Sequence, residues 1–231
     1  MTMTDPALTL EDVRFRWPGR ATFGLSVPGF HMTQGESVLL LGESGSGKST
    51  LLSLICGIVT AERGRVEVGG TDLSTLRAGA RDRFRAERIG VIFQQFNLLP
   101  YASVSDNILL PLRFAPERRK RAAPDEVATL CSALGLPVGI TGATAGRLSV
   151  GQQQRVAVAR ALIGQPPLIV ADEPTSALDA ATQDTFLGLL FDRIAPSRSS
   201  LLMVSHDERL GARFDRVVRL VDIAQTERLA A

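Results

Sequence analysis

The stretch that decides the fold of this chain is Gly42-Glu43-Ser44-Gly45-Ser46-Gly47-Lys48-Ser49-Thr50. The apolar run Val38 to Leu41 precedes it, and the apolar run Leu51 to Ile55 follows it. This order predicts a buried strand, a glycine-rich loop and a helix. Glycines let the loop curl until several N–H groups face one point, and the N-terminal end of the helix adds partial positive charge there. The stretch is therefore predicted to cradle phosphate groups.

Two side chains of this loop have a specific expected task. We expect Lys48 to reach the β- and γ-phosphates of a nucleotide and Ser49 to hold Mg²⁺. Only Lys48 and Lys120 among the 26 basic residues are lysines, and a compact ammonium fits a tight phosphate nest better than a guanidinium does. The alternative, a flexible turn, is disfavoured by the flanking strand and helix. The residues expected to surround the nucleotide here are Gly42, Ser44, Gly45, Ser46, Gly47, Lys48, Ser49 and Thr50.

The composition of the chain sets limits on its class. With 231 residues and 45% hydrophobic content, the chain can bury a substantial core, either in one large domain or in a core with a subdomain. The balance of 26 basic and 24 acidic residues gives no support for a nucleic-acid partner. Cys56 and Cys131 suit neither a zinc site nor a disulfide framework, which fits a reduced cytosolic interior.

No segment predicts export or membrane insertion. The first residues lack a basic segment followed by an apolar stretch, so no secretory signal is expected. The longest nearly apolar run, Leu51 to Val59, is less than half of the ~20 residues that a spanning helix needs. We therefore expect the chain not to cross a membrane by itself.

Several short segments predict strands near the loop. Thr9 to Phe15 alternates apolar and polar residues, which is typical of a half-buried strand, and Gly64 to Gly70 predicts a short strand ending in a hairpin or a tight turn. Trp17, the only tryptophan, stands beside a predicted Pro18-Gly19 turn. It either packs against the protein or stacks on an adenine ring, and the pattern alone leaves both open.

Three further apolar runs predict strands that end in polar residues. Ile89 to Phe93 is followed by Gln94, a candidate to touch metal or water. Leu168 to Ala171 is followed by Asp172 and Glu173. Asp172 is expected in the metal shell, and Glu173 is expected to align the attacking water or accept its proton.

The third of these runs, Leu201 to Val204, brings His206 to the same expected edge of the sheet, where it is predicted to hydrogen-bond the γ-phosphate.

The pattern from Asn97 to roughly Gly146 predicts a helical insertion, with helical periodicity in Val104 to Leu112 and in Asp125 to Leu134. Ser149 is expected to cap the helix that follows it. Two arginine-rich segments, residues 76–88 and 118–121, are interpreted as a solvated helix face and an exposed linker.

The motifs taken together resemble the ATPase subunits of ABC transporters. The most specific of them is the signature Leu-Ser-x-Gly-Gln at residues 148–152, directly upstream of Asp-Glu-Pro-Thr-Ser-Ala-Leu-Asp at 172–179. The resemblance implies an α/β fold: a P-loop NTPase core with a mixed, mainly parallel sheet, an antiparallel N-terminal β-subdomain and an inserted α-helical subdomain. It implies a single domain, with a nucleotide-binding core at 1–96 and 164–231 and a helical subdomain at 97–163.

The resemblance also implies how the subunit works. Two copies would form a homodimer, head to tail, around two ATP molecules with Mg²⁺. Trp17 would stack on adenine, Ser149, Gly151 and Gln152 would face the γ-phosphate bound to the partner, and Asp179 would link the two sites. Two integral-membrane permease subunits would hold the dimer at the cytoplasmic face of the inner or plasma membrane.

One residue departs from the family pattern. Val150 stands where the signature usually has glycine, and its β-branched side chain restricts the backbone before Gly151. Because Ser149 and Gly151 are present, we expect weakened or altered closure at most.

Within the family, residues 92–100 and 107–112 resemble the macrolide-exporter and lipoprotein-release group. This implies an exporter of macrolide, lipoprotein, peptide or haem type, without naming the cargo. The alternatives are a force-transmitting ATPase of a cell-division complex, which transports nothing, and a soluble protein acting on ribosomes or DNA. The last is disfavoured because neither a second ATPase domain nor a long coiled coil is seen in the sequence.

Overall fold

The computed structural model describes residues 6–17, 23–176 and 180–227. Two compact units make up the chain: residues 1–82 with 200–231, and residues 83–199. One of the two boundaries between them falls within helix α2 (Ala78–Arg88). The subdomain bounds expected from the sequence stay a prediction.

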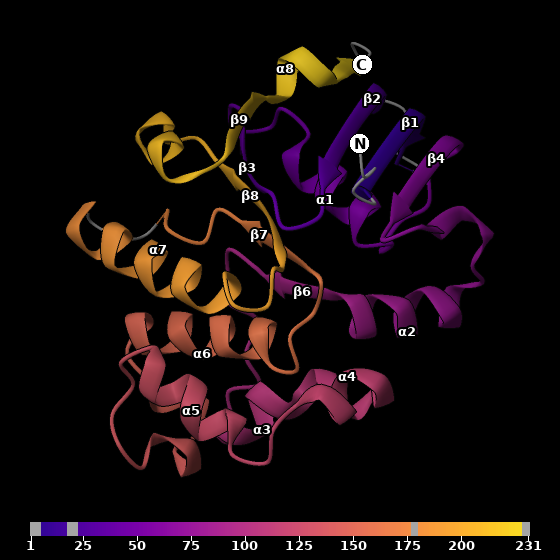
Figure 1. Ribbon diagram of the computed structural model, residues 1–231. Coiled ribbons are helices and arrows are strands. Elements are labelled where there is room, and N and C mark those ends of the chain that lie inside the picture. The colour runs from indigo at the N-terminus through magenta and orange to yellow at the C-terminus, as the bar shows by residue number, and fades with distance from the viewer. Residues whose placement is uncertain (1–5, 18–22, 177–179, 228–231) are drawn as a thin grey trace. The chain divides into compact units, whose positions relative to one another are not determined.

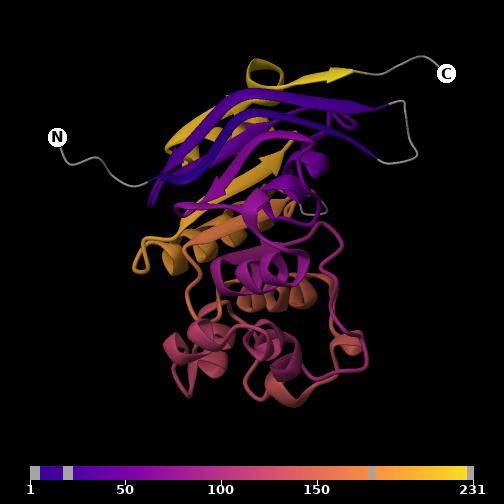
Figure 2. The same ribbon diagram turned by 90° about the vertical axis from the view of Figure 1, so that its right-hand side faces the viewer.

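An antiparallel sheet forms one layer of the first unit, with strand order β10-β2-β1-β4-β5. Figures 1 and 2 show β1, β2 and β4 running side by side. The predicted strands at 9–15 and 64–70 are confirmed, and in β1 the buried residues Leu8, Leu10, Val13 and Phe15 face the core. The strands are β1 (Pro6–Arg16), β2 (Gly24–Thr33), β4 (Arg63–Val68), β5 (Thr71–Asp72) and β10 (Gln225–Glu227).

A bulge interrupts the pairing of β1 with β4. The register shifts between Glu11 and Arg14, and Asp12 has a φ of 47°. A Cβ at Gly64 would lie 2.3 Å from the carbonyl oxygen of Asp12. Only glycine fits this close approach of two backbones.

Parallel strands form the other layer of the first unit. β3 (Ser37–Leu41) pairs with β8 (Ser200–Ser205) on one side and with β9 (Arg216–Arg219) on the other. Every residue of β3 and β8 is buried, as their continuous apolar runs predict. The short helices of this unit are α1 (Lys48–Ile55), α8 (Leu220–Ile223) and the 3₁₀ turns η1 (Leu73–Thr75) and η5 (Glu208–Arg213).

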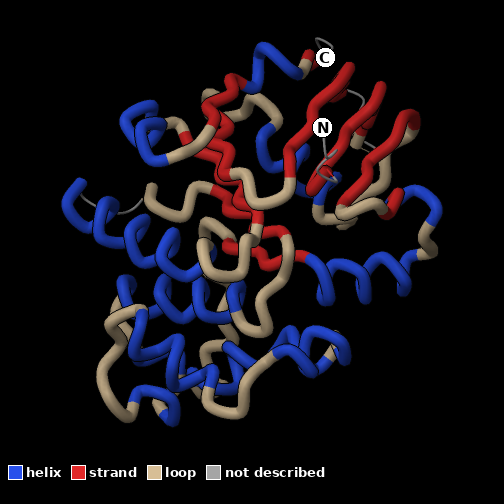
Figure 3. Tube along the Cα trace, in the orientation of Figure 1, coloured by secondary structure: helices blue, strands red, loops and turns tan. Residues whose placement is uncertain are grey.

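Helices dominate the second unit, shown in blue in the lower part of Figure 3. Helix α6 lies between α7 and the pair α3 and α5 (Figure 1), and it also contacts β6. The parallel pair is β6 (Ile89–Ile92) and β7 (Leu168–Asp172). The helices are α3 (Val104–Leu109), α4 (Pro116–Arg121), α5 (Glu126–Ala133), α6 (Val150–Leu162) and α7 (Ala180–Ile194), with 3₁₀ turns η2 (Leu110–Arg113), η3 (Ile140–Gly142) and η4 (Ala145–Arg147).

The mixed α/β fold with a parallel layer, an antiparallel layer and helices is therefore confirmed. Helix α2 has no buried residue, which confirms the solvated helix face expected at 76–88. Within it, Arg81 is half-buried and donates to the carbonyls of Gly57 and Leu76.

The exposed linker expected at residues 118–121 is wrong. These residues belong to α4, and Arg118 is only 1% exposed. Its guanidinium donates to five backbone carbonyls, those of Ala86, Ile89, Arg160, Ala161 and Ile163. The last three belong to the C-terminal end of α6, where carbonyls have no amide partner within the helix. Burial lowers the pKa of Arg118 to about 10.

The carboxylate of Glu87 fixes the start of α4 and thereby positions Arg118. The side chain of Glu87 accepts hydrogen bonds from the backbone N–H groups of Glu117, at 3.0 Å, and Arg118, at 2.7 Å. One arginine of a charged run is thus a structural residue, while its neighbour Arg119 is exposed.

Replacing Arg118 by alanine is predicted to destabilise the fold by about 3 kcal/mol or more, because five buried carbonyls lose their donor. Urea unfolding measures this change. Arg119→Ala, one position along the same helix, is the matched control and is expected within about 0.5 kcal/mol of the original protein. An Arg118→Ala protein as stable as the control would contradict this role.

Candidate functional site

The glycine-rich loop joins β3 to α1, as predicted. Gly45 and Gly47 have φ angles of 74° and 104°, which glycine adopts without steric cost. Gly47 is the residue before the first turn of α1, and within the described residues no side chain caps that helix end. The N–H groups in the first turn of α1 and the partial positive charge of this helix end therefore face the loop, and this arrangement suits an anion.

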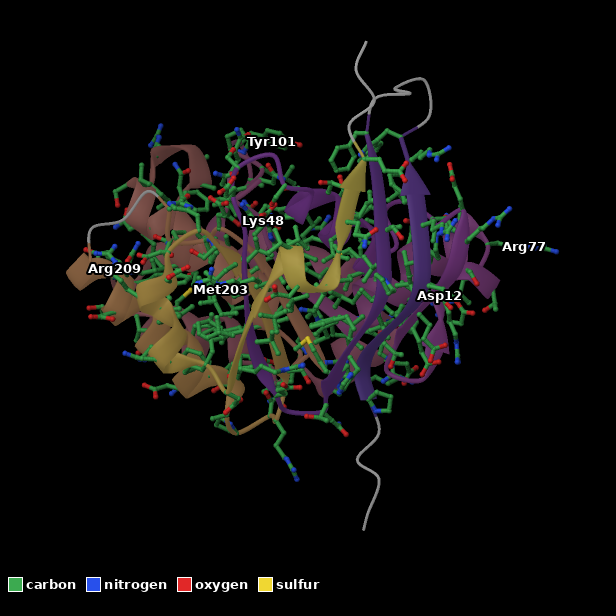
Figure 4. All side chains as sticks on the ribbon, turned by 90° about the horizontal axis from the view of Figure 1, so that it is seen from above. Asp12, Lys48, Arg77, Tyr101, Met203 and Arg209 are labelled. Atoms are coloured by element: carbon green, nitrogen blue, oxygen red, sulfur yellow. The ribbon has the colours of Figure 1, made fainter. Side chains whose placement is uncertain are left out.

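Lys48, labelled in Figure 4, is buried at the first position of α1, with 6% of its surface exposed. Its ammonium donates to the carbonyl oxygens of Gly42, at 2.7 Å, and Glu43, at 2.8 Å. A Cβ at Gly42 would lie 3.2 Å from Cδ of Lys48 and 2.9 Å from Oγ of Ser46. Glycine at position 42 thus lets the lysine chain lie across its own loop.

The hydroxyl of Ser46 tests whether the loop fits a phosphate ligand. It is a buried side-chain oxygen without a hydrogen-bond partner in the part of the chain that the structure describes. A buried hydroxyl left unpaired costs free energy, and such groups are uncommon. A phosphate oxygen would accept a hydrogen bond from this hydroxyl, so the loop fits a nucleotide.

The other loop residues differ in exposure, and their contact with a nucleotide stays a prediction. Ser44, Gly45 and Ser49 are exposed, and Thr50 is buried. The hydroxyl of Thr50 accepts a hydrogen bond of 3.2 Å from Nε1 of Trp17.

Trp17 is held between β1 and α1. Its ring meets that of Phe15 edge to face, with the centroids 5.2 Å apart and the planes at 86°. The indole therefore packs in the protein and lies beside the start of α1 at the same time. Stacking on adenine stays a prediction.

His206 comes to the edge of the parallel sheet where the loop begins. Leu41 pairs with Ser205, and the N–H of Gly42 donates to the carbonyl of Ser205 at 3.3 Å. His206 is exposed directly after this strand. The sequence therefore placed this histidine at the correct edge.

The acidic residues lie at the corresponding edge of the pair formed by β6 and β7. Ile92 is paired with Ala171, so Gln94, which follows β6, and Asp172, which ends β7, lie at the ends of adjacent strands. Gln94 is exposed in a turn, and Asp172 is half-buried as the last residue of β7. Glu173 has a φ of 43°, an uncommon left-handed conformation for a residue with a side chain.

Two glutamines that the sequence did not single out fix the loop after Glu173. Nε2 of Gln154, on α6, donates to the carbonyl of Pro174 at 2.6 Å, and Gln154 is 2% exposed. Nε2 of Gln183, on α7, donates to the carbonyl of Thr175 at 3.1 Å. Asp179 lies outside the described residues.

The signature segment caps α6, as predicted for Ser149. The hydroxyl of Ser149 accepts from the N–H of Gln152, and the side-chain oxygen of Gln152 accepts from the N–H of Ser149. Val150 is 58% exposed, and a Cβ at Gly151 would meet nothing within 4 Å. The tip of α6 therefore needs neither residue for packing within the described chain.

The candidate metal ligands supply oxygen atoms only: the hydroxyl of Ser49, the amide of Gln94 and the carboxylate of Asp172. Such oxygen donors suit Mg²⁺, which in proteins usually retains several water ligands and is also coordinated by the phosphates of a nucleotide. The described residues contain no cluster of three or more His, Cys, Asp or Glu side chains able to hold a metal ion alone.

Comparison with known proteins decides the family. The family model described as ABC transporter matches residues 25–176 of this chain. The chain belongs to the ABC transporter family. It is an ATP-binding, ATP-hydrolysing subunit of that family, as the loop and the signature predicted.

The relatives agree with this assignment. The lipoprotein-releasing system ATP-binding protein LolD of Novosphingobium aromaticivorans is 40% identical over 220 residues, which cover 94% of this chain and 97% of that protein. The macrolide export ATP-binding/permease protein MacB of Hyphomonas neptunium is 38% identical over 226 residues, covering 95% of this chain and 34% of that protein.

A solved structure also matches this ABC subunit. The dimeric, post-hydrolysis state of the ATP-binding cassette MJ0796, bound to ADP and Pi, superposes with a TM-score of 0.77 at 31% identity. The match covers 97% of this chain and 99% of that one. In the described part of the present chain, every helix is too short or too polar to span a bilayer.

Proposed function

We propose that two copies of this ABC subunit close head to tail on two ATP molecules and drive a membrane permease of the exporter type. The tip of α6 carries this proposal. Within the described residues a Cβ at Gly151 would meet nothing within 4 Å and Val150 is 58% exposed, so packing does not explain either residue, whereas the N-terminal end of a helix is suited to an anion. Ser149 and Gly151 would face the γ-phosphate bound to the partner copy, with Gln152 holding Ser149 in place.

Hydrolysis needs a base and charge stabilisation. The oxygen of a water molecule attacks the γ-phosphorus, the bond to the bridging oxygen of ADP breaks, and the water proton passes to the carboxylate of Glu173. Lys48 and His206 would hold the γ-phosphate oxygens. Ser49, Gln94 and Asp172 would hold Mg²⁺, which neutralises developing phosphate charge when bound.

The permease would be an integral-membrane partner, with two copies contacting the ATPase dimer at the cytoplasmic face. Exposed apolar side chains in the helical region support a docked partner, since Tyr101, labelled in Figure 4, is 79% exposed and Phe114 is 64% exposed. The names LolD and MacB belong to a lipoprotein-releasing system and a macrolide exporter. An exporter of macrolide, lipoprotein, peptide or haem type is the function that these relatives support best.

Glu173→Gln is expected to lower steady ATP turnover by about a hundredfold, because the amide cannot accept the proton of water. A phosphate-release assay on the purified protein or its complex measures this. Glu208→Gln, which changes an exposed carboxylate paired with Arg219, is the control and should keep full turnover. Undiminished turnover in Glu173→Gln would refute Glu173 as the base.

The variant Gly151→Ala distinguishes an effect on the stability of the fold from an effect on closure of the two copies. In the first turn of a helix, alanine is expected to stabilise the fold by up to about 1 kcal/mol, because its added Cβ meets open space. Turnover is nevertheless expected to fall about tenfold or more, since the methyl group would separate the helix tip from a phosphate on the partner copy.

Gly79→Ala provides the matched control for this variant. Gly79 is likewise the second residue of its helix, α2, and a Cβ there also meets nothing within 4 Å. It should show similar stabilisation with unchanged turnover. Equal turnover in the two alanine variants would contradict a role for the α6 tip at the nucleotide.

A further inference from the structure

The loop after Gln94 has a backbone that must be held in place. Phe96 and Asn97 are consecutive residues with φ angles of 44° and 48°. The left-handed conformation costs free energy for residues with a Cβ, and two in succession are not expected without outside support. The N–H of Phe96 donates to the carbonyl of Phe93, which closes a turn around Gln94.

A buried guanidinium supplies this support. Arg160, near the C-terminal end of α6, is 7% exposed. Its Nη2 donates to the carbonyl of Phe96 at 2.5 Å, and its Nη1 donates to the carbonyl of Asn97 at 2.7 Å. Two nitrogen atoms of one rigid planar group thus hold the two carbonyls of the left-handed pair in a fixed geometry, whereas the ammonium of a lysine is a point charge on a flexible chain.

Both sides of this contact are anchored. The carbonyl of Arg160 itself accepts from Nη2 of Arg118 at 3.4 Å. On the loop side, the fully buried Asn107 accepts from the N–H of Leu99 at 2.7 Å and donates to the carbonyl of Leu99 at 3.1 Å. Only Phe93 and the exposed turn at Gln94 and Gln95 lie between the end of β6 and the held pair.

We propose that Arg160 is a positioning residue for Gln94. By fixing the carbonyls of Phe96 and Asn97, it sets the direction in which the turn presents the amide of Gln94. The proposal rests on the metal-binding role proposed for Gln94. It also links that turn to the same helix whose other end carries Ser149 and Gly151, so that α6 and the Gln94 turn move together within one subunit.

The test is the Mg²⁺ dependence of ATP turnover in Arg160→Lys. Half-saturating Mg²⁺ is expected to rise about fivefold or more and kcat to fall about tenfold, while KM for ATP at saturating Mg²⁺ stays within about twofold. Arg155→Lys is the matched control, because Arg155 lies on the same helix and donates to the carbonyl of Gly135, away from the loop. It should behave like the original protein.

A double variant tests whether Arg160 acts through Gln94. If it does, the Mg²⁺ response of Arg160→Lys with Gln94→Ala should equal that of Gln94→Ala alone, since linked residues are not additive. Fold-changes that multiply, or an Arg160→Lys protein with the Mg²⁺ response of Arg155→Lys, would overturn the proposal.

Hydrogen exchange gives a readout that needs no turnover. Amides 95–99 should exchange about tenfold faster in Arg160→Lys, with α6 and β7 unchanged. Acceleration spread over α6 and β7 would show a general loss of stability and would overturn the positioning role. Absence of turnover in the original protein would count against the proposed function, whereas the exchange result judges Arg160 on its own.

Discussion

The hydrogen bonds of the Lys48 ammonium to two carbonyl oxygens of its own loop are the interaction on which the nucleotide site depends. Removing an ammonium from water costs several kcal/mol, and hydrogen bonds to carbonyl oxygens offset part of that cost. A phosphate in the loop would place an opposite charge beside the ammonium, and it would also accept a hydrogen bond from the Ser46 hydroxyl, which has no partner among the described residues. The glycines at 42 and 47 matter because they allow the chain to close this tightly around the lysine.

Buried cations also donate to backbone carbonyls outside the glycine-rich loop. Arg118 and Arg160 are buried, and their guanidinium groups donate to backbone carbonyls at places where the backbone cannot satisfy itself. Arg118 holds the end of a helix, and Arg160 holds two left-handed residues. Neither contact resembles a surface ion pair, so their contribution is not screened away by salt. Buried guanidinium groups that donate to carbonyls thus fix both the contact of α4 with the end of α6 and the loop after Gln94.

The sequence was most informative where a pattern has a period or a fixed spacing. Continuous apolar runs located β3, β6, β7 and β8, and Ser149, expected as a cap, lies at the start of α6. Polar residues after those strands were placed at the correct strand ends, because parallel strands bring their carboxyl ends to one edge.

The rest depended on side chains that bond the backbone at long range. In a run of four charged residues, no period distinguishes Arg118 from exposed Arg119. No sequence pattern distinguishes Gln154 and Arg160 from the other polar residues of α6, and only the folded chain shows which carbonyls they contact. The bulge at Asp12 that requires Gly64 is a contact between two strands, so local sequence could not reveal it.

Calorimetric titration of a nonhydrolysable ATP analogue into Lys48→Met tests the central claim most directly. Lys120→Met serves as the control, because Lys120 is the only other lysine of the chain and is exposed on α4. The account predicts that affinity falls on the order of a hundredfold for Lys48→Met, corresponding to about 3 kcal/mol of charged hydrogen bonds, and stays unchanged for Lys120→Met. Equal affinity in the two variants would contradict it.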